Sequence, residues 1–502
     1  MFDNVRRISS HLLVYGSADV AILATTFLLL PVYTRVLSPS DYGVLALVLV
    51  LEAVLKPLYR WGLDTSFLRL YYDCRNDAER RTLAGTIILF LLGANGGLTL
   101  LLLAFAPAIS SALFGVHDHV TILSLLFANG FIASFIFPAL TRLQIQEKSR
   151  AYATLNFVRS LGTIVLRLVF VVGLRWNVTG IVLADVIVST LMVAGLSPTI
   201  HAMTTWRFSR SVAREMLQFG FPRVPQGVMH QGMMMSDRFF LALYLPLEQV
   251  GVYLIGISIA SVVKLYPAAF TTAWMPFAFD SMRRADAPRL FGRLASYAFT
   301  VLSFLTLALA CLAGPVVELM TPQTFHASAR IVPFLALGMA IQSTSDFLST
   351  SINVAKRTHA YPIATAVAGF VSLSGYFLLI PRWGLFGAAA SLVAGQIVFV
   401  ATLSYFAQRY FPIRYEWGRL GMTAGVAAAL YGIMVTASPT SNAEALSIAI
   451  ALLVAYPVGL IGLGFFKTSE LRELRQLWTA FRGAPASDKP APSAPAESGD
   501  RT

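Results

Sequence analysis

Eleven charged side chains lie away from the ends of apolar stretches of this 502-residue sequence, and each stretch is long enough to cross a lipid bilayer. Six are basic and five are acidic. An ionisable group in hydrocarbon is energetically costly, and such residues usually line a substrate or ion pathway or relay protons. They are our candidates for function: Lys56, Arg159, Arg167, Arg223, Arg238, Lys264, Asp19, Glu52, Asp185, Asp237 and Asp346.

Among the basic candidates, Arg167 and Arg223 are the hardest to explain as structural residues. Arg167 lies near the middle of its apolar run, and Arg223 stands between Pro222 and Pro225. Prolines break a helix and free backbone polar groups, which is tolerated at membrane depth where the backbone lines protein or water. Arg159 lies about two turns from the inner end of its helix, so its long side chain could instead reach the membrane surface.

The acidic candidates have a possible second use in ion coupling. A carboxyl group held in hydrocarbon can become neutral and carry a proton across the membrane. Asp19 and Glu52 are the first candidates for this role, and Asp185 and Asp346 are the others. Three of them have a structural alternative. Glu52 and Lys56 have the i, i+4 spacing of a helical salt bridge, and Asp185 and Asp346 could each pair with a neighbouring arginine.

The composition predicts an all-α polytopic membrane protein rather than a soluble enzyme. Only 13% of the residues are charged, against about 25% in soluble domains, and the mean hydropathy is +0.68. Since a spanning helix needs about 20 apolar residues, we predict about fourteen spans. They cover roughly 11–34, 41–62, 82–106, 119–141, 151–174, 178–200, 215–245, 249–273, 293–319, 329–351, 360–381, 384–408, 418–437 and 443–466.

The other basic residues, which lie at or beyond the ends of the spans, alternate strongly between the two sets of connectors. One set, with the two termini, holds 28 lysines and arginines, whereas the other set holds only 4. Cytoplasmic connectors carry the excess of basic residues. We therefore predict an even number of spans and cytoplasmic termini.

The sequence also repeats itself at a spacing of about 208 residues. The segment 37–44 matches 245–252, and Lys56 falls on Lys264. Each repeat holds six spans, an even number, so the two copies enter the membrane in the same direction and form two lobes. We expect one lysine from each lobe to face a shared cavity. The predicted parts are a lobe at 1–206, a lobe at 207–410, two extra helices at 411–467, an amphipathic surface helix at 468–482 and a disordered tail at 483–502.

Other chemistries lack their usual sequence patterns. We find no phosphate-binding GxxxxGK[ST], no GxSxG and no cluster of metal-spaced histidines or cysteines. We therefore expect no cofactor, no metal and no enzymatic activity. The predicted outer loops are short, which disfavours a membrane glycan polymerase or ligase.

The segment 28–44, LLLPVYTRVLSPSDYGV, carries a family resemblance. Its pattern of Pro, Thr-Arg, Leu-Ser-Pro and Asp-Tyr-Gly resembles the start of the polysaccharide-biosynthesis flippases, the Wzx-type members of the multidrug/oligosaccharidyl-lipid/polysaccharide exporter superfamily. We expect Pro31 and Pro39 to end helices and Gly43 to permit close packing. The twelve-plus-two span layout agrees with the resemblance, which therefore covers nearly the whole chain.

The resemblance implies a function in the bacterial cytoplasmic (inner) membrane. The substrate would be an oligosaccharide on a polyprenyl diphosphate, moved from the cytoplasmic to the periplasmic leaflet by alternating access and driven by an ion gradient. A diphosphate needs cations, and the candidates are Arg223, Arg167, Lys56, Lys264 and Arg159. Partners would be membrane lipid and the glycosyltransferases and polymerase of the pathway, with no nucleic acid. The alternatives are a multidrug and toxin extrusion-type cation antiporter and a lipid II flippase.

Overall fold

The computed structural model describes residues 27, 29–282, 286–354, 357, 359–439 and 441–466, and within them it contains helices and no strand. The helices run in chain order as follows: α2 (Pro39–Arg60), α3 (Leu63–Asp73), α4 (Asp77–Phe114), α5 (Val120–Ala133), α6 (Ile136–Ile145), α7 (Ser149–Leu168), η1 (Val169–Gly173), α8 (Asn177–Met203), α9 (Arg210–Gly220), α10 (Arg223–Tyr244), α11 (Leu247–Ala260), η2 (Ser261–Lys264), α12 (Leu265–Ser281), α13 (Ala287–Cys311), α14 (Ala313–Met320), η3 (Gln323–Arg330), α15 (Val332–Val354), α16 (Ala360–Trp383), α17 (Leu385–Tyr410), α18 (Trp417–Ala437) and α19 (Asn442–Gly462). The prediction of an all-α membrane protein is confirmed.

Among the described residues, 11 helical segments are long and apolar enough to cross a membrane, and a bent pair formed by η3 and α15 adds a twelfth. Two of our predicted spans are not among them. The span at 11–34 lies mostly outside the described residues. The span at 215–245 is divided between α9 and α10, and α10 carries polar side chains such as Gln226, His230 and Gln231. The count of fourteen spans and the repeat layout therefore stay predictions. The surface helix and tail predicted at 468–502 lie outside the described residues and stay predictions as well.

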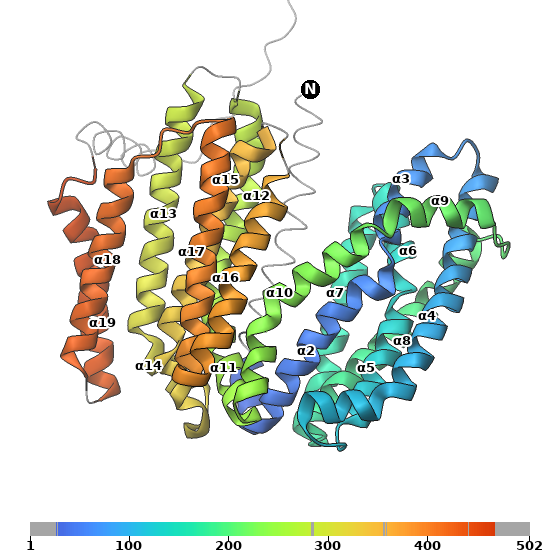
Figure 1. The fold of residues 1–502 in the computed structure, drawn as a ribbon, viewed down its shortest axis with the longest axis horizontal. Helices are drawn as coiled ribbons and strands as arrows, with labels where there is room; N and C mark the ends of the chain where they lie inside the picture. The colour runs from blue at the N-terminus through green and yellow to red at the C-terminus, as the bar shows by residue number, and fades with distance from the viewer. Residues whose placement is uncertain are drawn as a thin grey trace, which may run out of the picture.

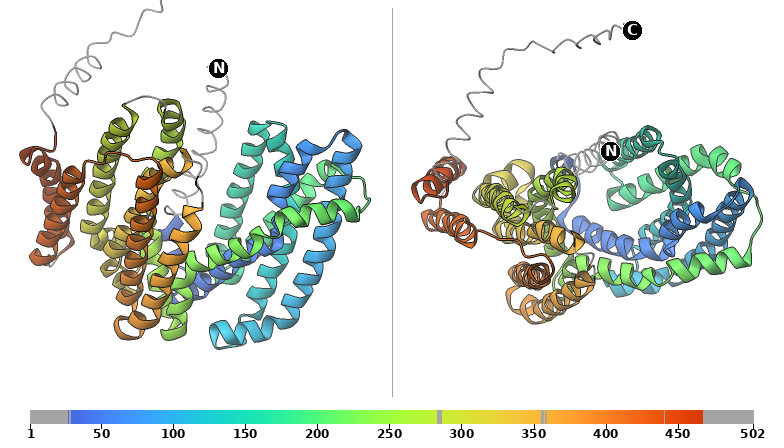
Figure 2. Two further views of the ribbon diagram at one scale, coloured as in Figure 1. Left: turned by 45° about the horizontal axis from the view of Figure 1, so that its top comes forward. Right: turned by 90° about the horizontal axis from the view of Figure 1, so that it is seen from above.

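The helices form two groups that meet at one end of the molecule. Figure 1 shows α2 to α8 in one group and α11 to α17 in the other, with α10 running from α9 beside α2. The groups touch where α2 and α11 begin, at the lower end of Figure 1, and the view from above in Figure 2 shows them side by side. Helices α18 and α19 pack on the outside of α13.

The segment that carries the family resemblance contains the start of α2 and also contacts the other helix group. Ser38 caps α2: its hydroxyl accepts a bond from the Asp41 backbone N–H, and the Asp41 carboxylate accepts one from the Ser38 N–H. The buried Thr34 hydroxyl donates to the carbonyl of Met320 at 3.0 Å. Residues 29–34 are helical and Pro39 is the first residue of α2. The expectation that Pro39 ends a helix was therefore wrong, because proline fits the first turn of a helix, where its missing N–H needs no partner. Pro31 lies within residues 29–34, three residues before their end, and its role stays a prediction.

Two glycines make the contact between α2 and α11. A Cβ atom added to Gly43 would lie 2.0 Å from the carbonyl oxygen of Leu247, and one added to Gly251 would lie 1.9 Å from that of Pro39. No side chain fits at either position while the two helices are this close. The expectation that Gly43 permits close packing is confirmed. We call this contact the glycine crossing.

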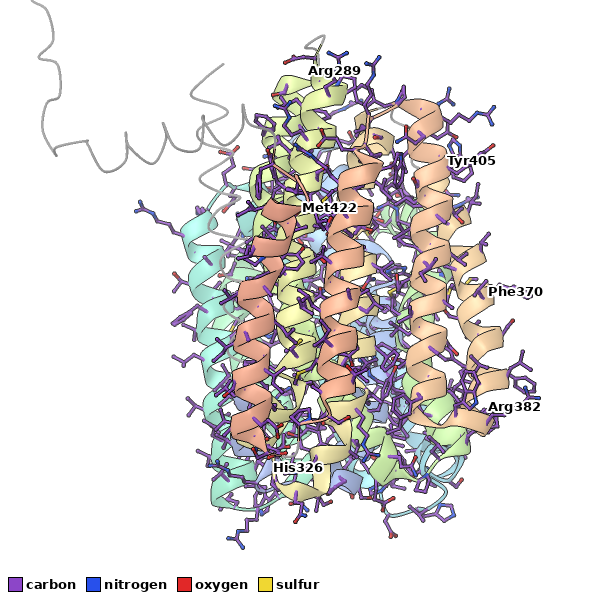
Figure 3. All side chains as sticks on the ribbon, turned by 90° about the vertical axis from the view of Figure 1, so that its left-hand side faces the viewer. Arg289, His326, Phe370, Arg382, Tyr405 and Met422 are labelled. Atoms are coloured by element: carbon purple, nitrogen blue, oxygen red, sulfur yellow. The ribbon has the colours of Figure 1, made fainter. Side chains whose placement is uncertain are left out.

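The outer surface has the polarity that a bilayer requires. In Figure 3, Phe370 and Tyr405 project outward from α16 and α17, where they are 73% and 63% exposed. Arg289 and Arg382 lie at opposite ends of the molecule in the same view. An apolar belt with charges at its two ends is typical of a protein that spans hydrocarbon. We call the end that holds α3, α9 and Arg289 the basic end.

Candidate functional site

A cavity of about 160 Å³ inside the first helix group collects three basic side chains. Lys56 and Arg60 come from α2, and Arg159 comes from α7. Glu52, one turn before Lys56, lines the same cavity. The remaining walls come from α2, α5 and α6 and the residues between them: Leu55, Tyr59, Leu126, Asn129, Gly130, Ala133, Ser134, Ile136, Phe137 and Leu140. We call this the cationic cavity.

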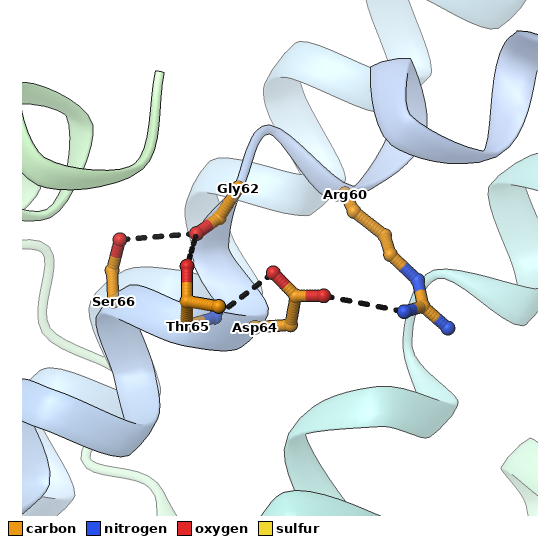
Figure 4. Close-up of polar contacts among 5 residues, drawn as sticks. All are labelled: Arg60, Gly62, Asp64, Thr65 and Ser66. Atoms are coloured by element: carbon orange, nitrogen blue, oxygen red, sulfur yellow. Dashed lines mark hydrogen bonds and ion pairs between the residues drawn. The ribbon is translucent and has the colours of Figure 1, made fainter. Parts of the chain in front are cut away.

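A sharp helix end places Arg60 at the cationic cavity. After Arg60 the chain takes two left-handed residues, Trp61 with φ 52° and Gly62 with φ 68°, before α3 begins. Glycine suits the second position because it has no Cβ, and because the backbone of Gly220 in α9 lies directly against it. Figure 4 shows the result: the Gly62 carbonyl accepts bonds from the hydroxyls of Thr65 and Ser66 at 3.0 and 3.1 Å.

The charge of Arg60 is partly compensated. Its Nη1 lies 3.2 Å from the Asp64 carboxylate one turn along the chain, as Figure 4 also shows. Both side chains are more than a third exposed, so this ion pair contributes little to stability and its geometry is easily exchanged for another anion. The helix end itself is held by Asn95, whose Oδ1 accepts from Trp61 Nε1 at 2.8 Å and whose Nδ2 donates to the Tyr59 carbonyl at 2.9 Å.

Four polar groups of the cavity have no side-chain hydrogen bond or ion pair among the described residues: Glu52, Lys56, Arg159 and the Asn129 Oδ1. Within the part of the chain that the structure describes, Lys56 and Arg159 form no hydrogen bond or ion pair. The predicted alternative of a Glu52–Lys56 salt bridge is likewise not formed there. The Asn129 Oδ1 is buried without a donor among those residues. Lys56 is exposed to the cavity space and Arg159 is half-buried, so both can bind an anion. A buried polar atom is normally paired, and a ligand hydroxyl can donate to the Asn129 oxygen.

Glu52 connects the cavity to a second charged site. Its carboxyl lies within electrostatic range of Lys56 and Arg159, and also of Arg167 and Asp185. The acid is exposed to the cavity space rather than packed between helices. Of the acidic candidates that the structure describes, Glu52 is the one that lines the cavity. Its protonation would change the charge beside Lys56 and Arg159.

Arg167 and Asp185 form a closed ion pair between α7 and α8. Arg167 Nη2 lies 2.7 Å from Asp185 Oδ2 and 2.9 Å from Oδ1, and its Nε lies 3.1 Å from the same Oδ1. This fork geometry commits both side chains to each other. Arg167 is not among the residues that line the cationic cavity. The structural alternative for Asp185 is therefore the one observed, and a substrate role for Arg167 stays a prediction.

The candidates in the second helix group lie elsewhere. Lys264 ends η2 and lies within electrostatic range of Asp346, Asp237 and Arg238. Asp237 accepts a bond from the Tyr253 hydroxyl at 3.2 Å and lies 3.7 Å from Arg238, and all three side chains are buried. None of these residues lines the cationic cavity. A cavity shared by Lys56 and Lys264 stays a prediction.

Arg223 and Asp19 complete the predicted set. Arg223 is the first residue of α10, is exposed, and holds its guanidinium 5.3 Å from the centre of the Phe219 ring. It does not line the cavity, although α10 passes α2 one turn later, where Gly227 lies against Pro57. Asp19 lies outside the described residues.

Sequence reasoning missed Arg60 and Asn129. Arg60 lies two residues before the end of the predicted span 41–62, and we assigned it to the basic connector that follows. No residue before Gly62 indicates that α2 ends at Trp61 and leaves Arg60 beside the cavity. Asn129 carries no charge, and only charged residues were considered. A search for any strongly polar side chain inside an apolar run would have found it.

Comparisons with known proteins support a common fold. A solved structure of the lipid II flippase MurJ, in an inward closed conformation, is similar with a TM-score of 0.68 and 14% identity, covering 90% of this chain and 99% of that one. An inward-facing multidrug resistance transporter of the MATE family, in the MOP superfamily, gives a TM-score of 0.58 and 16% identity, covering 78% of this chain and 97% of that one. At these identities the likeness shows the fold alone. No curated protein matches the chain.

A family model provides the sequence evidence. Residues 32–330 match the model of a family described as polysaccharide biosynthesis protein. The match includes α2, the glycine crossing and the whole cationic cavity. Because it spans more than half of the chain, the protein belongs to the polysaccharide biosynthesis protein family.

Proposed function

We propose that this protein is a flippase that moves an oligosaccharide linked to a polyprenyl diphosphate from the cytoplasmic to the periplasmic leaflet of the bacterial inner membrane. The observation that carries the proposal is the cationic cavity, in which Lys56, Arg60 and Arg159 converge inside a membrane-spanning helix group. Lys56 and Arg159 have no partner among the described residues, and a cation at membrane depth is costly unless an anion compensates it. A diphosphate is an anion that such a cavity can bind.

The rest of such a substrate explains why a protein is needed. Each sugar hydroxyl left unpaired in an apolar medium costs roughly 2–7 kcal/mol. The headgroup therefore requires a polar route while the polyprenyl chain stays in lipid. The cavity volume of about 160 Å³ is below the roughly 300–1,000 Å³ of most ligand sites. We infer that it holds the diphosphate, and that the sugars lie outside it.

The positions of the arginines support an orientation in the membrane, and the glycine crossing supports a transport cycle. The basic end carries the connectors rich in arginine and would face the cytoplasm, with both termini on that side. The glycine crossing would then close the periplasmic side in this conformation. Transport requires this contact to open while the basic end closes, which is the alternating access proposed for two lobes.

The proposal is tested by deleting the gene and measuring lipid-linked glycan in each leaflet of the inner membrane. We expect undecaprenyl-linked repeat units to accumulate on the cytoplasmic side and surface polysaccharide to be lost, with both restored by the wild-type gene. Accumulation of lipid II instead would identify a lipid II flippase. Unchanged glycans with retention of cationic dyes would overturn the proposal in favour of a drug exporter.

We also propose that Glu52 couples transport to an ion gradient. Its carboxyl lies in the cavity beside Lys56 and Arg159, so a change in its charge alters how strongly these cations hold a phosphate. In proteoliposomes, an imposed proton gradient should raise the flipping rate of the wild type but not that of Glu52→Gln. Asp185→Asn is the matched comparison, because its carboxylate is committed to Arg167. A Glu52→Gln protein that keeps the full gradient response would exclude Glu52 from the coupling.

A further inference from the structure

A second basic pocket lies at the basic end, separate from the cationic cavity. Its volume is about 410 Å³, and residues of α3, α4, α6 and the end of α8 line it. The lining residues are Phe67, Tyr71, Tyr72, Asp77, Arg80, Arg81, Ala84, Arg142, Ile145, Gln146 and Met203. It shares no lining residue with the cationic cavity. We call it the interfacial pocket.

The interfacial pocket has more positive charge than its own acid can compensate. Arg80 forms an ion pair with Asp77 at 3.0 Å and lies 5.1 Å from the centre of the Tyr71 ring. Arg81 and Arg142 form no side-chain hydrogen bond or ion pair with any residue that the structure describes. Three arginines against one aspartate leave two positive charges in excess.

One donor in this pocket is buried without an acceptor. The Nε of Arg80 has no hydrogen-bond partner among the described residues, although its neighbouring Nη1 is bound to Asp77. A buried donor without a partner is unfavourable. The site is therefore incomplete as it stands, and an oxygen-rich anion would satisfy both the donor and the excess charge.

The surroundings of the pocket indicate where that anion comes from. Tyr72 on its rim is 67% exposed, and Leu68, on the same short helix α3, is 43% exposed. Tyrosine is enriched at the level of lipid headgroups, where an apolar ring with a polar tip fits best. Basic pockets between spanning helices on the cytoplasmic side are typical headgroup sites. A free phosphate ion would make no use of the exposed apolar rim.

We propose that the interfacial pocket binds the headgroup phosphate of an anionic phospholipid, which stays in its leaflet and is not transported. Arg81 and Arg142 hold the phosphate oxygens, Arg80 completes the charge, and Tyr72 contacts the glycerol and upper acyl region. Since two positive charges are in excess, a headgroup with two phosphodiesters, as in cardiolipin, binds more tightly than one with a single phosphodiester. The bound lipid would tie α3 and α6 to the membrane surface.

The test is lipid binding by the purified full-length protein in detergent, measured by native mass spectrometry. Cardiolipin, phosphatidylglycerol and phosphatidylcholine are titrated in turn, and inorganic phosphate is used as a competitor. We expect affinity to fall in that order. Replacing both Arg81 and Arg142 by glutamine should weaken cardiolipin binding by about 25-fold, at roughly fivefold for each arginine. Arg75→Gln, which removes a nearby arginine outside the pocket, should leave binding unchanged.

A second variant separates the two sources of phosphate and guards against a folding defect. Tyr72→Ala changes an exposed side chain, so it should leave the melting temperature unaltered while weakening cardiolipin and not inorganic phosphate. Equal cardiolipin affinity in the wild type, the double arginine variant and Tyr72→Ala would overturn the proposal. So would a pocket in which millimolar phosphate displaces cardiolipin completely, since that result identifies a free-anion site.

Discussion

Replacing both Lys56 and Arg159 by glutamine is expected to lower the flipping rate by at least about a hundredfold. The two side chains are the cations of the cationic cavity that have no partner within the described residues. A hydrogen bond to a charged group contributes about 1.5–3 kcal/mol, so each loss costs about tenfold or more. The rate is measured with reconstituted protein and a lipid-linked oligosaccharide made accessible to a leaflet-specific enzyme.

Two comparisons make this result specific. Arg382→Gln removes an exposed arginine that does not line the cavity and lies at the end of the molecule opposite Arg289, as Figure 3 shows. It should leave the rate unchanged. Arg159→Lys keeps the charge but loses the planar fork, so it should fall between the wild type and Arg159→Gln. A normal rate in the double glutamine variant, at normal membrane levels, would exclude the cationic cavity from the substrate path.

Replacing Gly43 by valine is expected to prevent the periplasmic side from closing and to abolish transport. The added Cβ would lie 2.0 Å from the Leu247 carbonyl oxygen. This is a backbone atom, so it cannot move away by a change of side-chain rotamer. Overpacking of this kind costs about 1–3 kcal/mol or more. A bias of about 3 kcal/mol between two states changes their ratio about 150-fold. The conformation in which α2 and α11 separate should then dominate.

The state is measured by crosslinking across the glycine crossing. Cysteines are introduced at Ser40 and Glu248, next to the crossing, in a chain whose Cys74 and Cys311 are replaced by serine. A short bifunctional maleimide should join them readily in the wild-type background and weakly with Gly43→Val. Gly93→Ala is the control, because a Cβ there meets no atom within 4 Å. Undiminished crosslinking and transport in Gly43→Val would show that the helices tolerate the side chain.

The amino-acid sequence by itself determined the fold class and the family. Long apolar runs allow only helices to cross a bilayer, since each backbone N–H and C=O must be satisfied within its own segment. The segment 28–44 also contains the capping box of Ser38 and Asp41, which depends on residues three apart and which we did not predict. The sequence placed Gly43 at a close contact, although it did not say what the contact was. Pro39 was misjudged, because proline is compatible with the start of a helix as well as with its end.

Only the tertiary structure decided which charges share a site. The lipid-facing side of a spanning helix is as apolar as the side that packs on other helices, so periodicity does not say which face of α2 or α7 points inward. Packing rotated Lys56 and Arg159 into one cavity, joined Arg167 to Asp185, and left Arg223 on the surface beside Phe219. It also added Arg60 and Asn129, which belong to the cavity through a helix end and a neighbouring helix. Lys56 and Arg159 are 103 residues apart, and a single sequence carries no local signal for a contact at that separation.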